Sequence, residues 1–344
     1  MKKRFIAVLS LALIFGSVNT QAKDNVIPDF KITLQQAPKG NTEAQFNVGV
    51  MYGTGTGVKQ DDAQAVYWYT KAMQQGNILA LNNLGLLYAT GSGVPKDYQK
   101  AKQLLENAAN HGYLEAIYNL GVLYLNQDKT ILDYSRAFFY FKQAAEKGFL
   151  KAQYQLAEIY REGKFVEKDI EQAIYWYTKA AEQGDAFSKN ALGVIYKNGE
   201  NVKQDFKKAF QWFKQAAEQG LDSGQANLAM MYNFGYGVPK NDKQATYWYK
   251  KAAEQGLAEA QYNLAVKYDD GQGIRQDYAQ ALYWYQKASE QNLAVAQNNL
   301  AILYALGRGT ARDRVIAKQW FKKACDNSHK EACRIMQELD ELYN

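Results

Sequence analysis

A period of 36 residues runs through this chain eight times and limits its fold more than any other feature. Tyrosine occupies the place of Tyr52 in all eight copies, and alanine occupies the places of Ala65 and Ala72. Steps of 36 from Gly40 lead to Gly76, Gly112, Gly148, Gly184, Gly220, Gly256, Asn292 and Ser328. A constant period of this length predicts a stack of one supersecondary unit, because a single unit cannot bury its apolar face alone.

Each copy has the pattern of two amphipathic helices. In the first copy, Ala44, Val48 and Tyr52 share one face of a helix over residues 42–52. Gly55 follows, where a left-handed residue can end this helix, and Asp61 stands where a carboxylate can cap the next one. Both places recur along the chain, although Gln127 replaces the glycine in the third copy and predicts a different loop there. The pattern predicts an all-α protein.

The repeats define the domain organisation. We expect eight repeats over residues 40–328, closed by a polar capping helix over residues 329–344. Residues 23–39 carry no copy of the repeat, which predicts a flexible arm. Residues 1–22 have the pattern of a signal peptide, with a basic start, an apolar run, and small residues before a cut after Ala22. The mature protein is therefore expected to be exported, either to the periplasm or out of the cell.

Charge and hydropathy argue against two classes of partner. The formal charge of +6 falls to about +3 when the three basic residues of the signal leave. The mature chain has no run of lysine and arginine, so it offers no concentrated basic face for nucleic acid. We expect no membrane span in the mature chain, because no segment after the signal is apolar enough to cross a bilayer.

The repeat resembles a known family. Gln-Tyr-Asn-Leu-Ala at 261–265 and Lys-Ala-Ala-Glu-Gln-Gly at 251–256 are similar to the Sel1-like repeat, and the resemblance extends from residue 40 to about residue 336. It implies a right-handed α-solenoid related to tetratricopeptide arrays. It also implies a scaffold or adaptor that binds a protein or peptide partner and needs no cofactor. Because a fold does not fix its partner, the function rests here on analogy.

Cys325 and Cys333 are the only cysteines. Their spacing, with Lys-Ala before the first and seven residues between the two, resembles the cysteine-rich branch of the family, where such pairs join adjacent helices. An exported chain meets an oxidising compartment, which favours this disulfide. The alternatives are two buried thiols or a metal site that includes His329. Two cysteines and one histidine lack a fourth ligand, so we predict no metal.

A row of asparagines is the candidate binding site. They recur at one phase of the first helix, where arrays of this shape have their concave side, and Gln155 and Ala191 interrupt them. An amide offers donors and an acceptor, and it can hold the backbone of a bound peptide. The competing interpretation is that these amides pair with neighbouring groups inside the array. The predicted partner-binding residues are Asn47, Asn83, Asn119, Asn227, Asn263 and Asn299.

The residues beside this row vary from repeat to repeat, which fits either a specificity position or simple surface drift. They are Phe46, Asn82, Tyr118, Tyr154, Asn190, Ala226, Tyr262 and Asn298.

Enzymatic motifs are lacking in the sequence. It contains no Ser-x-x-Lys, Lys-Thr-Gly, Gly-x-Ser-x-Gly or His-Glu-x-x-His, and His111 and His329 lie far apart in the array. We therefore predict no catalytic residues, although a carboxylate-based site stays open. The tryptophans lie on the same face of the second helix as the alanines, which favours core packing over a sugar-binding ladder. The alternatives to a binding scaffold are a hydrolase of peptidoglycan or β-lactams and a secreted factor that engages a host surface.

Overall fold

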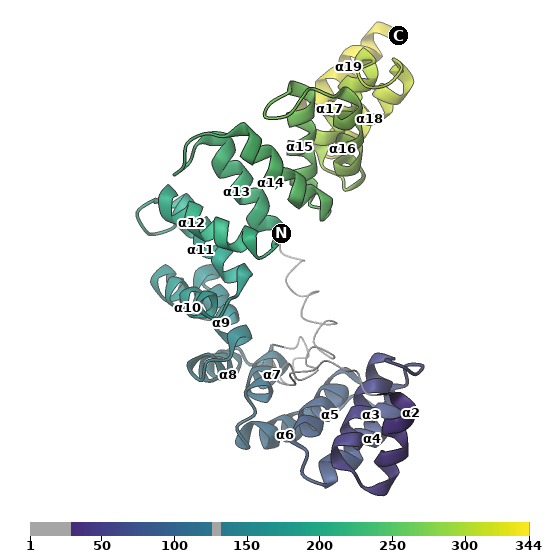
Figure 1. Ribbon diagram of the computed structural model, residues 1–344, viewed down its shortest axis with the longest axis vertical. Coiled ribbons are helices and arrows are strands. Elements are labelled where there is room, and N and C mark those ends of the chain that lie inside the picture. Colours follow the sequence, from purple (N-terminus) through teal and green to yellow (C-terminus); the bar gives the residue numbers. More distant parts are fainter. Residues whose placement is uncertain (1–28, 126–131, 344) are drawn as a thin grey trace. The chain divides into compact units, whose positions relative to one another are not determined.

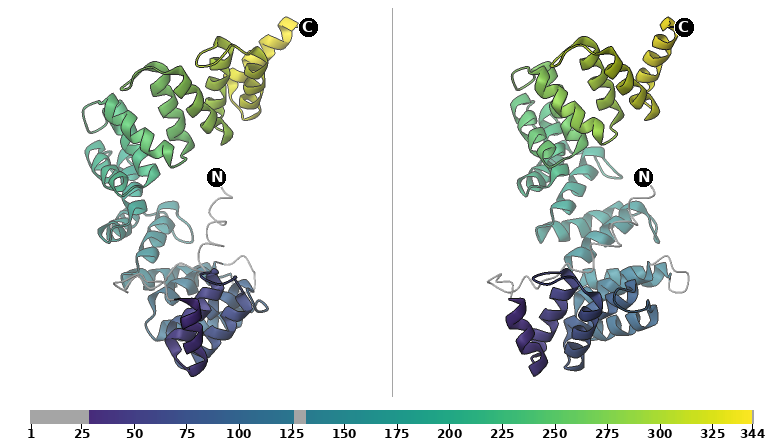
Figure 2. Two further views of the ribbon diagram at one scale, coloured as in Figure 1. Left: turned by 45° about the vertical axis from the view of Figure 1, so that its right-hand side comes forward. Right: turned by 90° about the vertical axis from the view of Figure 1, so that its right-hand side faces the viewer.

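The computed structural model describes residues 29–125 and 132–343, with side chains up to residue 338. Each repeat contains two α-helices, called helix A and helix B below, and the described ranges contain no strand. This arrangement confirms the predicted all-α solenoid. The chain divides into two compact units, one ending at Trp176 and the other beginning at Tyr177. Figures 1 and 2 show that the helices of each unit follow one another in chain order.

The helices have nearly uniform lengths. In the first four repeats they are α3 (Thr42–Thr54), α4 (Asp62–Gln74), α5 (Ile78–Thr90), α6 (Tyr98–Asn110), α7 (Leu114–Tyr124), α8 (Tyr134–Glu146), α9 (Leu150–Glu162) and α10 (Ile170–Glu182). In the last four they are α11 (Ala186–Asn198), α12 (Phe206–Glu218), α13 (Asp222–Phe234), α14 (Asp242–Glu254), α15 (Ala258–Asp270), α16 (Tyr278–Glu290), α17 (Ala294–Leu306) and α18 (Arg314–Asp326).

A recurring local device connects helix A to helix B. Gly55 ends α3 with a φ of 73°, a left-handed conformation that glycine adopts without a steric penalty. Asp61 then accepts a hydrogen bond from the backbone N–H of Gln64 and caps α4. The backbone N–H of Asp61 donates in turn to the carbonyl oxygen of Tyr52 at 2.9 Å, and the equivalent bond closes the loop in all eight repeats. The loop at Gln127 lies outside the described residues.

The core lies between helices A and B and contains small residues beside one large one. The alanines at the phases of Ala65 and Ala72 are at most 3% exposed in every repeat, so they let neighbouring helices approach closely. The residue at the phase of Tyr69 is always large and buried: Tyr69, Leu105, Phe141, Tyr177, Phe213, Tyr249, Tyr285 and Phe321. Each such side chain contributes about 1.5–3 kcal/mol by leaving water.

Tryptophan is less central to the core than its neighbour at the phase of Tyr69. Trp68 and Trp176 are buried, whereas Trp212, Trp248, Trp284 and Trp320 are half-buried.

A flexible arm was predicted over residues 23–39, but residues 30–39 of this segment are helical. Here α2 (Phe30–Gln36) and a short 3₁₀ helix (Ala37–Lys39) pack on α3. Ala37 is fully buried, and the Phe30 ring meets the Tyr52 ring edge-on at 5.3 Å. The physical reason is that Val48 and its neighbours in the first helix A have no preceding repeat to cover them. This half-repeat covers them instead.

The two ends of the chain are described to different extents. The predicted signal peptide over residues 1–22 lies outside the described residues. At the other end, α19 (Lys330–Tyr343) packs Ala332, Ile335 and Met336 against the last repeat. No helix within the described ranges is long and apolar enough to cross a membrane.

Candidate functional site

The six asparagines of the predicted row lie on helices A, three in each unit, but their surroundings differ. Asn119 on α7 is only 3% exposed, so it is closed to a partner. The other five are half-buried, and each therefore presents part of its side chain to solvent: Asn47 on α3, Asn83 on α5, Asn227 on α13, Asn263 on α15 and Asn299 on α17.

Two of these amides join consecutive repeats. Nδ2 of Asn119 donates to Oδ1 of Asn82 at 2.9 Å, and Nδ2 of Asn227 donates to Oδ1 of Asn190 at 2.9 Å. Both acceptors lie 37 residues earlier, on helix A of the preceding repeat. The Asn119–Asn82 pair is buried and the Asn227–Asn190 pair is half-buried, and because amides removed from water are costly unless they are paired, these bonds favour correct stacking. For Asn119 the packing interpretation accounts for the residue.

The other asparagines bond within their own surroundings. Nδ2 of Asn263 donates to the Glu259 carbonyl one turn earlier at 2.7 Å. Nδ2 of Asn299 donates to the Tyr285 hydroxyl at 3.1 Å. Asn83 hydrogen-bonds the Tyr69 hydroxyl, and burial raises the pKa of Tyr69 to about 12. One hydrogen bond uses only part of the capacity of an amide, so these half-buried groups keep capacity for a ligand.

The variable residues beside the row belong largely to the packing between helices. Phe46 lies 5.7 Å from the Tyr69 ring, Tyr118 lies 5.4 Å from the Phe141 ring, and Tyr262 lies 5.9 Å from the Tyr285 ring. Asn82 and Asn298 are buried at the same place in their repeats. These contacts with helix B account for the bulk of the side chains without any partner.

Glutamines form a polar connection between repeats that the sequence analysis missed. Nε2 of Gln261 donates to the Ala253 carbonyl at the end of the preceding helix B, at 3.2 Å. Gln291, at the end of its own helix B, donates to Oε1 of Gln261 at 2.9 Å and to the Gly256 carbonyl at 2.8 Å. The Ala253 carbonyl already accepts the Gly256 backbone N–H at 3.0 Å, so the bond from Gln261 is an additional one that connects consecutive repeats.

The glutamine signal was visible in the sequence at the repeat period. The buried glutamines that donate to the preceding helix B are Gln153, Gln225, Gln261 and Gln297, and Gln45 donates in the same way to Ala37 in the 3₁₀ helix before the first repeat.

A buried ion pair distinguishes the seventh repeat, and the sequence analysis also missed it. Lys267 is 3% exposed, and its Nζ lies 2.9 Å from Oδ1 of Asp242 and 3.0 Å from Oε1 of Gln272. The hydrogen bond from Lys267 holds the pKa of Asp242 below its ordinary value. Other repeats place an apolar side chain where Lys267 stands, such as Met231 or Leu303. The departure from this apolar phase was the available signal.

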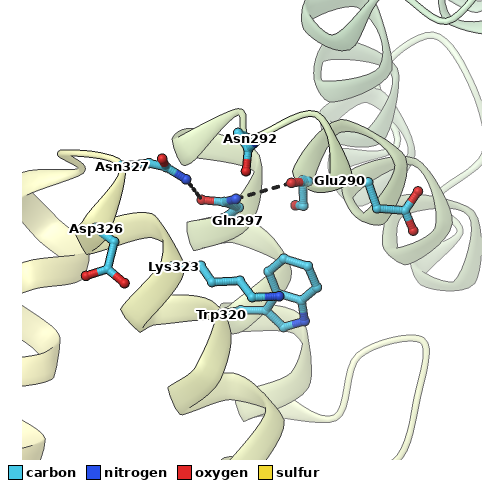
Figure 3. A pocket seen from close by; sticks show the side chains of 8 residues that line it. Glu290, Asn292, Gln297, Trp320, Lys323, Asp326 and Asn327 are labelled. Carbon is cyan, nitrogen blue, oxygen red and sulfur yellow. Dashed lines mark hydrogen bonds between the residues drawn. The ribbon is translucent and has the colours of Figure 1, made fainter.

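A shallow pocket lies beside the last two repeats (Figure 3). Lys323 lies over the Trp320 ring, with its Nζ 4.1 Å from the ring centroid. On the other side of the pocket, Asn327 donates to Gln297 at 2.9 Å, and Gln297 donates to the Ser289 carbonyl at 3.2 Å. Two of the amides that line this pocket, those of Gln297 and Asn327, are thus already bonded within the array, and none of the six predicted asparagines lies among its lining residues.

Titratable side chains form no catalytic cluster in the described ranges. Nδ1 of His111 contacts the Asn107 carbonyl at 2.8 Å, and Nδ1 of His329 accepts from the Ala332 backbone N–H at 3.2 Å. Both imidazoles therefore form hydrogen bonds with backbone groups at helix ends. Burial and the neighbouring Asp270 raise the pKa of Asp269, whose Oδ2 accepts from the Tyr285 hydroxyl at 3.4 Å. Among the described residues, no three metal-ligating side chains come together.

The two cysteines form a disulfide. Cys325 near the end of α18 is bonded to Cys333 in α19, and their Cα atoms lie 4.6 Å apart. The bond joins the last helix of the array to the last helix B and is consistent with an oxidising compartment.

These features define a tetratricopeptide-like α-solenoid in which hydrogen bonds of side-chain amides connect consecutive repeats. A family model described as the Sel1 repeat matches eight consecutive segments, which together run without a gap. They are residues 42–77, 78–113, 114–149, 150–185, 186–221, 222–257, 258–293 and 294–329. The chain belongs to the Sel1 repeat family.

Two solved structures share most of the fold. One is a protective antigen present in uropathogenic Escherichia coli strains, with 34% identity, a TM-score of 0.77, and coverage of 91% of this chain and 67% of that chain. The other is a Sel1 repeat protein from Oxalobacter formigenes, with 28% identity, a TM-score of 0.72, and coverage of 90% of both chains. A comparison with curated proteins gave no match. Sel1 repeat proteins generally mediate protein–protein interaction and are generally not enzymes.

Proposed function

We propose that this protein is an exported scaffold that binds a protein or peptide partner in the cell envelope or outside the cell. The observation that carries the proposal is the row of half-buried asparagines on helices A: Asn47, Asn83, Asn227, Asn263 and Asn299. Within each unit, amides that recur from one repeat to the next can bond the backbone of an extended segment without selecting its side chains. Asn119 acts in packing, because its amide is buried against Asn82.

Two observations support a place outside the cytoplasm. The disulfide between Cys325 and Cys333 is favoured in oxidising compartments. The Escherichia coli relative is described as a protective antigen, a description compatible with a protein outside the cytoplasm. The amino-terminal sequence supplies the export signal in this proposal. Fractionation of cells that express the full chain tests it, because a protein retained in the cytoplasm with an uncleaved amino terminus contradicts export.

The binding proposal is tested by photo-crosslinking in cells with the full chain. The test variant changes Asn83, Asn227 and Asn263 to alanine, and the control variant changes Asn107 and Asn110, which are exposed on helix B, to alanine. Circular dichroism first establishes that both variants fold. We expect the wild type and the control to crosslink one partner, and the test variant to lose it.

The other outcomes are equally informative. Equal capture by all three proteins moves the binding surface away from the asparagines. If no protein crosslinks in any of them, the scaffold proposal is wrong, and turnover of peptidoglycan fragments or β-lactams becomes the assay to run.

A further inference from the structure

Three aromatic side chains of the second unit form a stack at the surface, called the aromatic patch below. Phe206 begins α12, Phe234 ends α13, and Tyr236 lies in the loop that follows α13. The Phe206 and Tyr236 rings are stacked at 4.7 Å, and the Tyr236 and Phe234 rings at 5.4 Å. Phe234 is 58% exposed and Tyr236 is 38% exposed, so much of the patch faces solvent.

The repeat itself does not require these aromatic residues. In other described repeats the place of Phe234 is held by Thr54, Thr90, Glu162, Asn198, Asp270 or Leu306. The place of Tyr236 is held by Thr56, Ser92, Lys164, Glu200, Gln272 or Arg308. Because other repeats carry mainly polar residues at both places, the repeat fold does not require two exposed rings side by side. Clustered exposed aromatic residues are typical of binding surfaces.

The loop that carries Tyr236 has a fixed position. Gly235 and Gly237 flank Tyr236, and both adopt left-handed backbone with φ near 70°. A Cβ atom added at Gly237 would lie 2.3 Å from the carbonyl oxygen of Phe206, so the loop lies directly on the first turn of α12. A partner that docks here meets an ordered surface and pays little conformational entropy to order it.

The surroundings of the patch are positively charged. Lys203, Lys207 and Lys208 precede or begin α12 beside Phe206, and all three are exposed. The nearby carboxylates already have hydrogen-bond donors. Glu200 accepts from Nδ2 of Asn198 at 3.1 Å, Asp205 accepts the Lys208 backbone N–H at 2.9 Å as the helix cap, and Asp242 is bonded to Lys267. Lys208 lies over the Tyr196 ring at 5.1 Å. Lys203 and Lys207 thus remain as the charges that a ligand meets.

We propose that the aromatic patch, with Lys203 and Lys207, docks a short acidic segment of a partner protein. An aromatic or branched aliphatic side chain of that segment stacks on Phe234 and Tyr236, and flanking carboxylates pair with the two lysines. Exposed aromatic anchors supply affinity, and complementary charge supplies selectivity and faster association. This inference rests on the proposed binding function and names a surface and a partner chemistry for it.

The test selects peptides from a random phage-displayed library against the immobilised mature protein. The selected peptides are synthesised with a fluorophore, and their affinities are measured by anisotropy. One variant, Phe234→Asn with Tyr236→Gln, installs residues that other repeats carry as Asn198 and Gln272. A second variant, Lys203→Glu with Lys207→Glu, installs the residues found at Glu167 and Glu171.

Matched controls change the same residue types elsewhere in the second unit. Leu306→Asn removes an exposed apolar residue at the phase of Phe234, and Lys243→Glu reverses a lysine at the phase of Lys207. We expect selected peptides to be acidic with an apolar centre. Their binding should weaken about tenfold or more in each test variant, stay unchanged in the controls, and weaken with added salt.

Several results would overturn the inference. These are a selected pool that is basic or uncharged, affinities that the test variants leave unchanged, and an empty selection. The same variants in the crosslinking experiment separate the two proposals. If both test variants still capture the partner of the wild type, the patch is not its docking site, but the scaffold function stands. If the wild type captures no partner and selects no peptide, both proposals fail.

Discussion

The ion pair between Lys267 and Asp242 gives the sharpest test of how this array is stabilised. The proposed changes are Lys267→Met, Asp242→Phe and the two together. Together they copy the previous interface, where Met231 and Phe206 pack in one apolar cluster at the corresponding places. An ion pair with a buried member is a weak source of stability, because desolvation of the Lys267 charge offsets most of its attraction to Asp242. The double variant should therefore be at least as stable as the wild type.

The two single changes should differ in cost. The Lys267 side chain is only 4% exposed, and Asp242→Phe removes the carboxylate that pairs with its ammonium. This change should lower the free energy of unfolding by about 3 kcal/mol. Lys267→Met leaves Asp242, whose side chain is 31% exposed and lies 3.5 Å from Nζ of Lys240. That carboxylate can still reach water, so this change should cost about 1 kcal/mol.

The assay is urea unfolding followed by circular dichroism, repeated as the pH is lowered. Because Lys267 depresses the folded-state pKa of Asp242, the pair contributes stability above the ordinary pKa of an aspartate, and this contribution is lost as pH falls through the lowered value. Below about pH 4 the wild type should lose more stability than the double variant. If Asp242→Phe costs less than Lys267→Met, or if the double variant is the least stable of the four, the reasoning is wrong.

Three further predictions concern other interactions. Asn119→Ala should cost about 1–2 kcal/mol in urea unfolding, because it leaves the buried side-chain Oδ1 of Asn82 unpaired, whereas Asn263→Ala should change stability by less than about 0.5 kcal/mol. An equal cost for both would contradict this account of the row. Cys333→Ser should lower the stability of the last repeat by about 2.5 kcal/mol, and thermal unfolding with and without reductant checks this because reductant should affect only the wild type. Tyr69 and Tyr118, whose pKa burial raises to about 12, should resist ionisation until the array unfolds. A tyrosine whose pKa is raised on folding contributes stability below its unfolded pKa near 10, and this contribution is lost as the pH rises from about 10 to 12. The stability of the protein should therefore fall over that range, and an absorbance titration of tyrosine ionisation checks this.

The helices of this protein could be predicted from the sequence because their signals are local and repeated. An alanine such as Ala65, a capping aspartate such as Asp61 and a glycine such as Gly55 each act within a few residues, and eight copies make every signal visible. The helical half-repeat over residues 30–39 was missed for the opposite reason. It occurs once, and its helix is fixed by contacts such as that between Phe30 and Tyr52 rather than by a recurring motif.

The contacts between repeats could not be derived from the period alone. A step of 36 finds equivalent residues, whereas neighbouring repeats join places that are not equivalent. Asn119 meets Asn82 across 37 positions, and Gln291 meets Gln261 across 30. The recurrence of asparagine was therefore visible, but its partners depended on how one helix pair lies on the next. The exposed stack of Phe234 on Tyr236 was hidden for a related reason, because it breaks the period instead of following it.

The ion pair also bears on how such a chain avoids assembling wrongly. Eight similar repeats allow one of them to be skipped during folding, or to be exchanged with that of a second molecule. Lys267 fits only a repeat that offers a carboxylate at the place of Asp242. If the eighth repeat took the place of the seventh, Leu303 would face Asp242 and the charge of Lys267 would lose its partner. The ion pair thus favours the correct order of the repeats in the stack. It adds little stability, but it makes incorrect assembly less favourable.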